Sequence, residues 1–167
     1  MIETSALKSM LLFIVVIIVL AVSIIRLKRS NANYQAPLSA ESIVSLLWQN
    51  GTSSSVKGSW IIFHHLDQEY TINISKLPVL IVIKQTSLEG FKENTVVLRE
   101  VAQAVSLDTV LTTVQIEGAP AKRAVIQLNA IETCMGAFAQ RVSIYLDIID
   151  ETEKRFFDEI ERRNNNN

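Results

Sequence analysis

A hydrophobic run near the N-terminus constrains the fold of this chain more than any other feature of its sequence. The run carries no charged residue, and as a helix rising about 1.5 Å per residue it covers most of a hydrocarbon core about 30 Å thick. Lys8 and Arg26 flank it and can extend their charged ends toward the bilayer surface. We therefore predict one transmembrane anchor, formed by Met10, Leu11, Leu12, Phe13, Ile14, Val15, Val16, Ile17, Ile18, Val19, Leu20, Ala21, Val22, Ser23, Ile24 and Ile25.

The residues after the run indicate that the anchor is retained. A cleaved signal peptide has its charges before the apolar segment and small residues after it, whereas Arg26, Lys28 and Arg29 follow directly here. Because Lys and Arg stay on the cytoplasmic side of a membrane, this basic flank predicts a cytosolic domain. A periplasmic domain is the close alternative, since many N-terminal anchors export the domain behind them. In either orientation we expect a single-pass protein of a bacterial inner membrane.

The sequence of the anchor indicates no chemistry within the membrane. Ser23 is its one polar residue, and the run has none of the ionisable groups that mark proton or ion pathways. It also lacks the small-xxx-small pattern of tightly packed transmembrane helix pairs. We therefore interpret the segment as a tether.

The rest of the chain has the size and composition of one globular domain. The chain has 167 residues and a formal net charge of −1, but Lys8 and the basic flank lie beside the anchor, so the domain is mildly acidic. Nucleic acid is not an expected partner, because phosphate binding needs a clustered basic face. Cys134 is the only cysteine, which excludes a disulfide within the chain and a cysteine-rich zinc site.

Shifts in composition divide the chain into four parts. Residues 1–29 hold the anchor and its basic flank, and residues 30–39 are polar with one proline, as expected for a linker. Residues 40–163 are predicted to form a small α+β domain that ends in a long amphipathic helix. Residues 164–167 are all asparagine and are predicted to be a disordered tail.

Local patterns predict the secondary structure of the domain. Ser39 can cap a helix that runs from Ala40 to about Asn50, and Thr52–Ser55 is expected to be a loop. Runs of β-branched and aromatic residues predict strands, and helical spacing of apolar residues predicts two more helices. After the first helix we expect strands at Trp60–Leu66, at Tyr70–Ile74 and from Pro78, a helix at Leu88–Val105, a strand at Thr109–Glu117 and a helix starting at Pro120.

The third predicted strand differs from the others in composition. The run VLIVIK after Pro78 is so uniformly apolar that we expect both of its faces to be covered. Asp67–Glu69 are expected to form the turn between the first two strands. Together the elements predict an α+β fold in which a transmembrane helix precedes a small domain with a mainly antiparallel sheet and about three helices, the last one long.

The last predicted helix carries the most regular apolar pattern in the domain. Its large side chains recur at alternating intervals of three and four residues, which is the spacing of a heptad seam. The pattern suits a coiled coil with a second copy or another protein, and it equally suits a helix packed across the chain's own sheet. Near the end of the helix, Phe156, Phe157 and Ile160 are expected to be exposed apolar contacts. The residues of this candidate interaction seam are Leu128, Ile131, Met135, Phe138, Val142, Tyr145, Ile149 and Phe156.

No group of residues has a catalytic, cofactor-binding or metal-binding pattern that outweighs a structural explanation. His64 and His65, with Asp67 and Glu69 nearby, have suitable chemistry for a metal, but adjacent residues on a strand point to opposite faces. Cys134 lies in an apolar segment, where burial disfavours the thiolate. The C-terminal acidic residues alternate with basic ones, as on a solvated helix face. We therefore expect no enzyme activity, no cofactor and no metal.

By elimination, the sequence predicts a protein that acts through its surface. The leading hypothesis is a membrane-anchored interaction or assembly subunit, an accessory component of a bacterial envelope complex, which contacts another protein or a second copy of itself. The alternative hypothesis is a membrane-tethered sensor that binds a small ligand and signals through its C-terminal helix.

Overall fold

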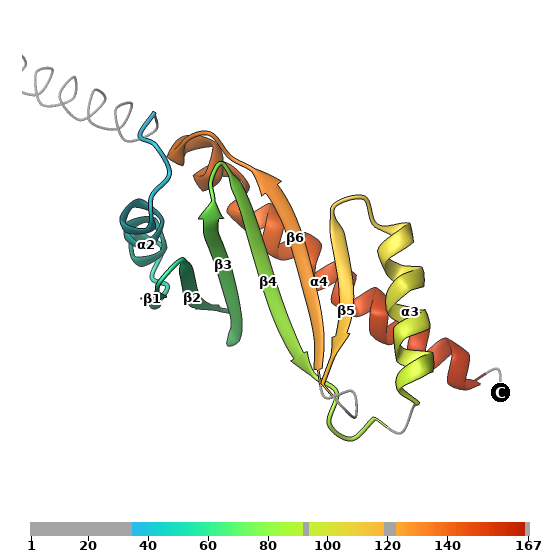
Figure 1. The fold of residues 1–167 in the computed structure, drawn as a ribbon. Coiled ribbons are helices and arrows are strands. Elements are labelled where there is room, and N and C mark those ends of the chain that lie inside the picture. The colour runs from blue at the N-terminus through green and yellow to red at the C-terminus, as the bar shows by residue number, and fades with distance from the viewer. Residues whose placement is uncertain (1–34, 92–93, 119–122, 166–167) are drawn as a thin grey trace, which may run out of the picture. The chain divides into compact units, whose positions relative to one another are not determined.

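A six-stranded antiparallel sheet organises the part of the chain that the structure, a computed structural model, describes (Figure 1). The described residues are 35–91, 94–118 and 123–165. The predicted anchor, its basic flank and the first half of the linker lie outside these residues. Within the described residues, no helix is both long enough and apolar enough to cross a membrane.

The strands follow one another along the sheet except at one point. β1 (Ser54–Lys57), β2 (Trp60–His65), β3 (Gln68–Lys76) and β4 (Val79–Ser87) form a meander in chain order. The hairpin of β5 (Thr112–Glu117) and β6 (Arg123–Ile131) then joins with β6 beside β4, which gives the order β1-β2-β3-β4-β6-β5. Every neighbouring pair is antiparallel. The prediction of an α+β domain with a mainly antiparallel sheet is therefore confirmed.

Three helices accompany the sheet in the described part of the chain, namely α2 (Ala40–Gln49), α3 (Thr95–Asp108) and α4 (Met135–Asn165). α2 begins where predicted, because Ser39 and Ser42 form a capping box in which each side chain accepts a hydrogen bond from the other residue's backbone N–H. α4 is 31 residues long, which confirms the long final helix. Its last residues belong to the segment predicted to be a disordered tail.

Two predicted boundaries in the first half of the sheet are wrong. The expected loop Thr52–Ser55 contains the start of β1, a short edge strand whose serines have little intrinsic preference for strands. The turn between β2 and β3 consists of Leu66 and Asp67 instead of Asp67–Glu69, and their φ angles are 49° and 62°. Two successive residues with positive φ match the twist of a hairpin, so β3 can begin directly after them.

The helix predicted for Leu88–Val105 begins later, at Thr95. Asn94 is its N-cap, and its side chain accepts a hydrogen bond from the backbone N–H of Val96 at 3.1 Å. Gly90 lies in a turn before the helix and has a φ of +97°, a conformation that interrupts helical backbone. The apolar pattern that starts at Leu88 therefore begins in a turn, and only its later residues belong to the helix.

The largest difference between the predicted and the observed elements concerns the final helix, which was predicted to start at Pro120. Arg123–Ile131 form strand β6, and the helix begins at Met135. Every second residue in the first part of β6 is fully buried, namely Ala124, Ile126 and Leu128. A strand with one covered face requires this period of two. β5 is also shorter than predicted, since it begins at Thr112.

Among the described residues, one face of the sheet is covered by helices and the other is free of them. α4 runs behind the sheet in the view of Figure 1, and the residues from Pro37 onward belong to one compact unit. α3 lies against β5, where the Ser106 hydroxyl accepts a hydrogen bond from the Val114 N–H at 2.8 Å and so protects backbone groups of this edge strand. The core between sheet and helices includes Ile43, Leu47, Ile61, Phe63, Tyr70, Ile72, Leu80, Val82, Leu98, Val101, Ile126, Leu128, Phe138, Ile149 and Phe156.

Candidate functional site

The helix-free face of the sheet carries an unusual number of apolar side chains. Ile62 of β2, Ile81 and Ile83 of β4 and Val125 of β6 all belong to this face, and Thr71 of β3 pairs with both Ile62 and Ile83. In an antiparallel sheet with one solvated face, the outward residues are commonly polar. This face therefore has the composition of a surface that another molecule covers.

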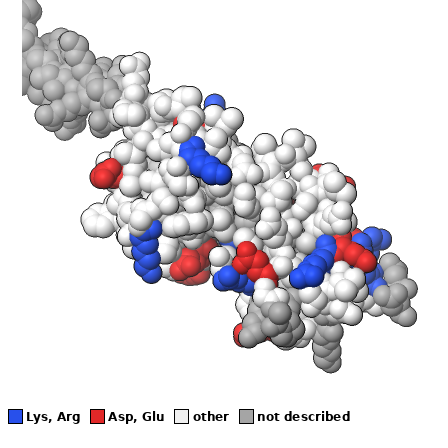
Figure 2. Space-filling view, in the orientation of Figure 1, with Lys and Arg blue, Asp and Glu red and all other residues white. Residues whose placement is uncertain are grey.

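A cavity of about 440 Å³ runs across this face, and every strand contributes to its lining. Trp60, Ile62, Ile83 and Val125 give it an apolar lining, and Gln85, Gln115 and Gln127 supply side-chain amides, beside Thr71 and the charged Lys57 and Glu117. Figure 2 looks onto this face and shows mostly uncharged side chains, with acidic and basic ones along its lower margin, a basic one in its upper middle and an acidic one at its left. We call the four apolar residues and the three glutamines of this lining the open sheet face. An apolar floor with uncharged hydrogen-bonding groups suits a protein segment as the occupant.

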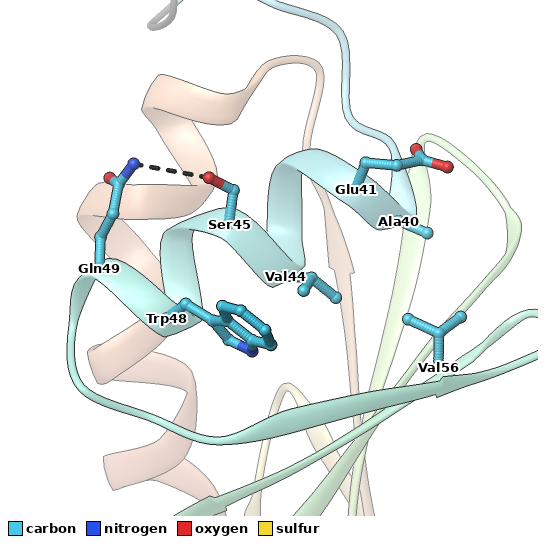
Figure 3. A pocket seen from close by; sticks show the side chains of 7 residues that line it. All are labelled: Ala40, Glu41, Val44, Ser45, Trp48, Gln49 and Val56. Carbon is cyan, nitrogen blue, oxygen red and sulfur yellow. Dashed lines mark hydrogen bonds between the residues drawn. The ribbon is translucent and has the colours of Figure 1, made fainter.

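A second apolar surface lies between α2 and β1 (Figure 3). Ala40, Val44 and Trp48 of α2 and Val56 of β1 line an open groove of about 690 Å³ together with polar residues of α2. Trp48 is 66% exposed and Val56 is 47% exposed. We call these four residues the α2 groove. A tryptophan so exposed beside other apolar side chains is a typical mark of a contact surface.

A third exposed apolar cluster lies where α3 ends and β5 begins. Val110 is 98% exposed and Leu111 is 50% exposed, and both line a cavity of about 420 Å³ with Ile144 and Ile148 of α4. Leu107, in the last turn of α3, is 79% exposed. Sequence patterns did not indicate this cluster, because its members come from the end of one helix, a turn and the middle of another helix.

The candidate interaction seam lies mostly inside the domain. Leu128 and Ile131 belong to β6, where Leu128 is buried and Ile131 is 68% exposed. On α4 all members except Val142 are buried, namely Met135, Phe138, Tyr145, Ile149 and Phe156. The expectation that Phe156 and Ile160 are exposed is wrong, because they are 0% and 1% accessible. Phe157 is partly exposed, and its ring stacks on that of Phe91 at 5.4 Å between centroids.

A polar cluster connects the sheet to α4 within this core. Lys84 of β4 is almost fully buried, and its Nζ lies 2.8 Å from Asp150 Oδ1 and 2.5 Å from Glu153 Oε2. Thr86 donates a hydrogen bond to Glu153, and the Tyr70 hydroxyl donates one to Asp150 at 2.5 Å. Every charged group of the cluster therefore has a partner. Such an arrangement fixes how α4 lies on the sheet, and it has no free group with which to act on a substrate.

Tyr70 in this cluster has an altered acidity. Burial, followed by its hydrogen bond to Asp150 and the nearby carboxylate charges, raises the pKa of Tyr70 well above the usual range of tyrosine. The unfolded chain therefore releases this proton at lower pH than the folded domain does. Consequently the stability that Tyr70 contributes is complete below about pH 10 and is lost as the pH rises further.

We expect Tyr70→Phe to weaken the alkaline pH dependence of stability. At neutral pH the variant loses one hydrogen bond to a carboxylate and should be destabilised by about 1 to 2 kcal/mol. Above about pH 10 this difference from the native chain should shrink, because phenylalanine cannot ionise. Urea unfolding of both proteins over a pH series checks this. A constant difference across the alkaline range would contradict it.

Glu132, which directly follows β6, is another buried acidic residue. The Glu132 side chain is fully buried, accepts a hydrogen bond from the Tyr145 hydroxyl and lies 3.3 Å from Arg141 Nη1. Its backbone N–H donates to the carbonyl of Pro78 at 3.0 Å. Burial and the bond to Glu132 raise the pKa of Tyr145. These contacts join the turn after β6 to the first turns of α4.

The two histidines lie on opposite sides of β2. His64 is exposed, with its Nε2 3.7 Å from Glu69 Oε2, whereas His65 is half-buried, with its ring 6.4 Å from that of Tyr70. Among the described residues, no group of at least three His, Cys, Asp or Glu side chains could hold a metal ion. Cys134 is partly exposed and lies just before α4 instead of within it.

The acidic residues of the last helix have two different environments. Glu151 lies on the exposed side and pairs with Arg155, whereas Glu159 is only 20% exposed, and Arg162 and Arg163 lower its pKa to about 2. Asp150 and Glu153, in contrast, reach Lys84 in the core. The interpretation of the C-terminal charges as a solvated face therefore holds for Glu151 and Arg155 and fails for the Lys84 partners.

Comparison with known proteins identifies the fold and no family. No protein-family model matches the sequence, and no curated protein matches it. The crystal structure of YbjN from E. coli, proposed to be a transcription regulator, is similar with a TM-score of 0.56 over 75% of this chain and 94% of its own, at 7% identity. A crystal structure of an uncharacterized protein from Methanothermobacter thermautotrophicus is similar with a TM-score of 0.52 over 75% of this chain and 99% of its own, at 14% identity. Identities this low support a shared fold alone.

Proposed function

We propose that this chain is a single-pass membrane-anchored interaction subunit, an accessory component of a bacterial envelope assembly that binds its partner through the open sheet face. The observation that carries the proposal is the sequence of β4. Its residues Val79–Ile83 are apolar on both sides, whereas helices of the described chain cover only the side of Leu80 and Val82. Burial of apolar area gains about 25 cal/mol per Å², so covering Ile81 and Ile83 favours association with a partner.

The charges of the domain favour a protein partner over nucleic acid. Many of its basic side chains already form ion pairs with carboxylates, among them Lys84, Arg123, Arg141, Arg155, Arg162 and Arg163. The cavity of the open sheet face is lined by one basic residue, Lys57, and one acidic residue, Glu117, so it offers no cluster of basic groups for phosphates. The partner is another protein or a second copy of this chain, and contact with it requires no catalytic residue, cofactor or metal.

The membrane part of the proposal rests on residues 10–29, which the structure does not describe. The basic flank Arg26, Lys28 and Arg29 supports a domain on the cytosolic side, with the periplasmic side as the alternative. The sensor hypothesis has less support, because the three cavities described above are open surface grooves instead of enclosed pockets.

One cross-linking experiment tests both parts of the proposal. A photoreactive apolar residue replaces Ile83 in the full chain, and cells are irradiated before their membranes are isolated. We expect the chain in the membrane fraction, joined to one discrete partner or to a second copy. The matched control carries the same residue at Gln140, an exposed position on α4, and should give no adduct. A chain found in the soluble fraction would contradict the anchor, and equal labelling at both positions would contradict the open sheet face.

A further inference from the structure

α2 has a second apolar side that the core of the domain does not use. Ile43 and Leu47 are buried against the domain, whereas Ala40, Val44 and Trp48 recur every four residues along the α2 groove. Figure 3 shows Val44 and Trp48 on the side of α2 that faces the groove. Because residues four apart share one helix face, these three residues form a continuous apolar row.

A polar row lies directly beside this apolar row. It consists of Glu41, Ser45 and Gln49, again at intervals of four residues, and the Gln49 amide donates a hydrogen bond to Ser45 at 3.5 Å. Backbone and side-chain hydrogen bonds, the latter from Ser39, lower the pKa of Glu41, so its carboxylate stays charged and needs water or headgroups around it. α2 contains no lysine or arginine, so electrostatic attraction to anionic lipid is not its mode of contact.

The length of the linker sets how far α2 can be from the predicted anchor. Fourteen residues, 26–39, separate the end of the anchor from the start of α2. A flexible chain of that length has a typical end-to-end distance of about 20 Å. Within the described residues α2 is also the first element, and Ala40, its first residue, belongs to the groove.

We propose that the apolar row of α2 rests in the interfacial layer of the membrane, with the Trp48 indole at the level of the lipid headgroups. Tryptophan suits this layer because its ring is apolar and its indole N–H can donate a hydrogen bond to a headgroup. The inference rests on the membrane anchor of the proposed function. Contact between α2 and the membrane gives the domain a fixed orientation, in which the open sheet face remains available for a partner.

Fluorescence quenching in vesicles tests the position of Trp48. The chain contains two tryptophans, so Trp60→Phe leaves Trp48 as the only indole and Trp48→Phe leaves Trp60. Each full-length variant is reconstituted in phosphatidylcholine vesicles, with or without bromine on the acyl carbons nearest the headgroup. We expect bromine to reduce Trp48 fluorescence several-fold and to leave Trp60 fluorescence unchanged, because Trp60 belongs to the open sheet face.

Two further variants separate membrane contact from other effects. In the Trp60→Phe background, Val44→Glu places a charge in the apolar row and should restore Trp48 fluorescence in brominated vesicles. Ser45→Glu places the same charge in the polar row and should leave the quenching unchanged. Val44 is only partly buried and Ser45 is exposed, and neither belongs to the buried row of Ile43 and Leu47, so circular dichroism should show an intact domain.

The possible outcomes distinguish this inference from the proposed function. Chains that do not float with the vesicles would overturn both the anchor and the membrane contact of α2. Chains that float while bromine leaves Trp48 unquenched would overturn the membrane contact alone. Trp48 that is protected from aqueous iodide and yet unquenched by bromine would identify a protein occupant of the α2 groove, which also overturns the proposal.

Discussion

Replacing Phe138 by alanine is expected to destabilise the domain by about 3 to 5 kcal/mol, a large share of the 5 to 15 kcal/mol that typically stabilises a domain. Phe138 is fully buried between α4 and the sheet, so its removal leaves a cavity that a long helix cannot close without shifting. Urea unfolding of the full chain in mild detergent, followed by near-ultraviolet circular dichroism, measures the loss. Ile144→Ala on the same helix is the control, because Ile144 is 51% exposed and its truncation should cost less than about 1 kcal/mol.

The same pair of variants separates the two explanations of the heptad spacing in α4. If the seam packs on the chain's own sheet, Phe138→Ala reduces stability and does so equally at all protein concentrations. If the seam pairs two chains instead, Phe138→Ala reduces self-association and leaves the unfolding of the monomer unchanged. The second result would contradict the burial of Phe138 within one domain.

Features set by neighbouring residues could be predicted from the sequence. The start of α2 is an example, because Ser39 and Ser42 cap the helix across only three residues. Gly51 after its end is another, since its φ of +74° is a conformation that glycine adopts at little cost. In both cases the interactions lie within a few residues, so the local pattern contains the information.

The misassignment of β6 shows where such patterns fail. Leu128 and Ile131 fit a helical seam because residues three apart share a helix face, but on a strand the same spacing places them on opposite faces. Leu128 is accordingly buried, while Ile131 is 68% exposed. The alternation of Ala124, Ile126 and Leu128 was the signal for a strand, and short apolar runs commonly satisfy both periods at once.

Sequence reasoning missed Lys84 as a member of the polar cluster between the sheet and α4, although its position on the core side of β4 was predictable. It follows Leu80 and Val82 at intervals of two, so it had to point toward the core if they did. Its partners were not predictable, because Asp150 and Glu153 lie 66 and 69 residues away along the chain. The contact depends on how α4 is placed across the sheet, which tertiary packing decides.

Lys84→Met is the second substitution expected to have a large effect. It keeps the volume of the side chain but removes the charge that balances Asp150 and Glu153, and Glu153 is only 16% exposed. Breaking a buried ion pair on one side commonly costs 3 to 5 kcal/mol, and since Asp150 is 38% exposed we expect a loss of about 3 kcal/mol. Arg155→Met is the matched control, because the Arg155 and Glu151 side chains are 53% and 58% exposed and their ion pair should contribute at most about 1 kcal/mol.

Removing the carboxylate charges in the same chain tests the cause of that loss. If unbalanced charge destabilises Lys84→Met, the triple variant Lys84→Met, Asp150→Asn, Glu153→Gln should recover part of the lost stability, since amides can still accept the hydrogen bonds from Tyr70 and Thr86. Urea unfolding of the single and triple variants measures the recovery. A triple variant no more stable than Lys84→Met would mean that the cost arises from altered packing instead of charge. A Lys84→Met variant no less stable than Arg155→Met would mean that water already solvates the cluster, and that apolar burial alone holds α4 on the sheet.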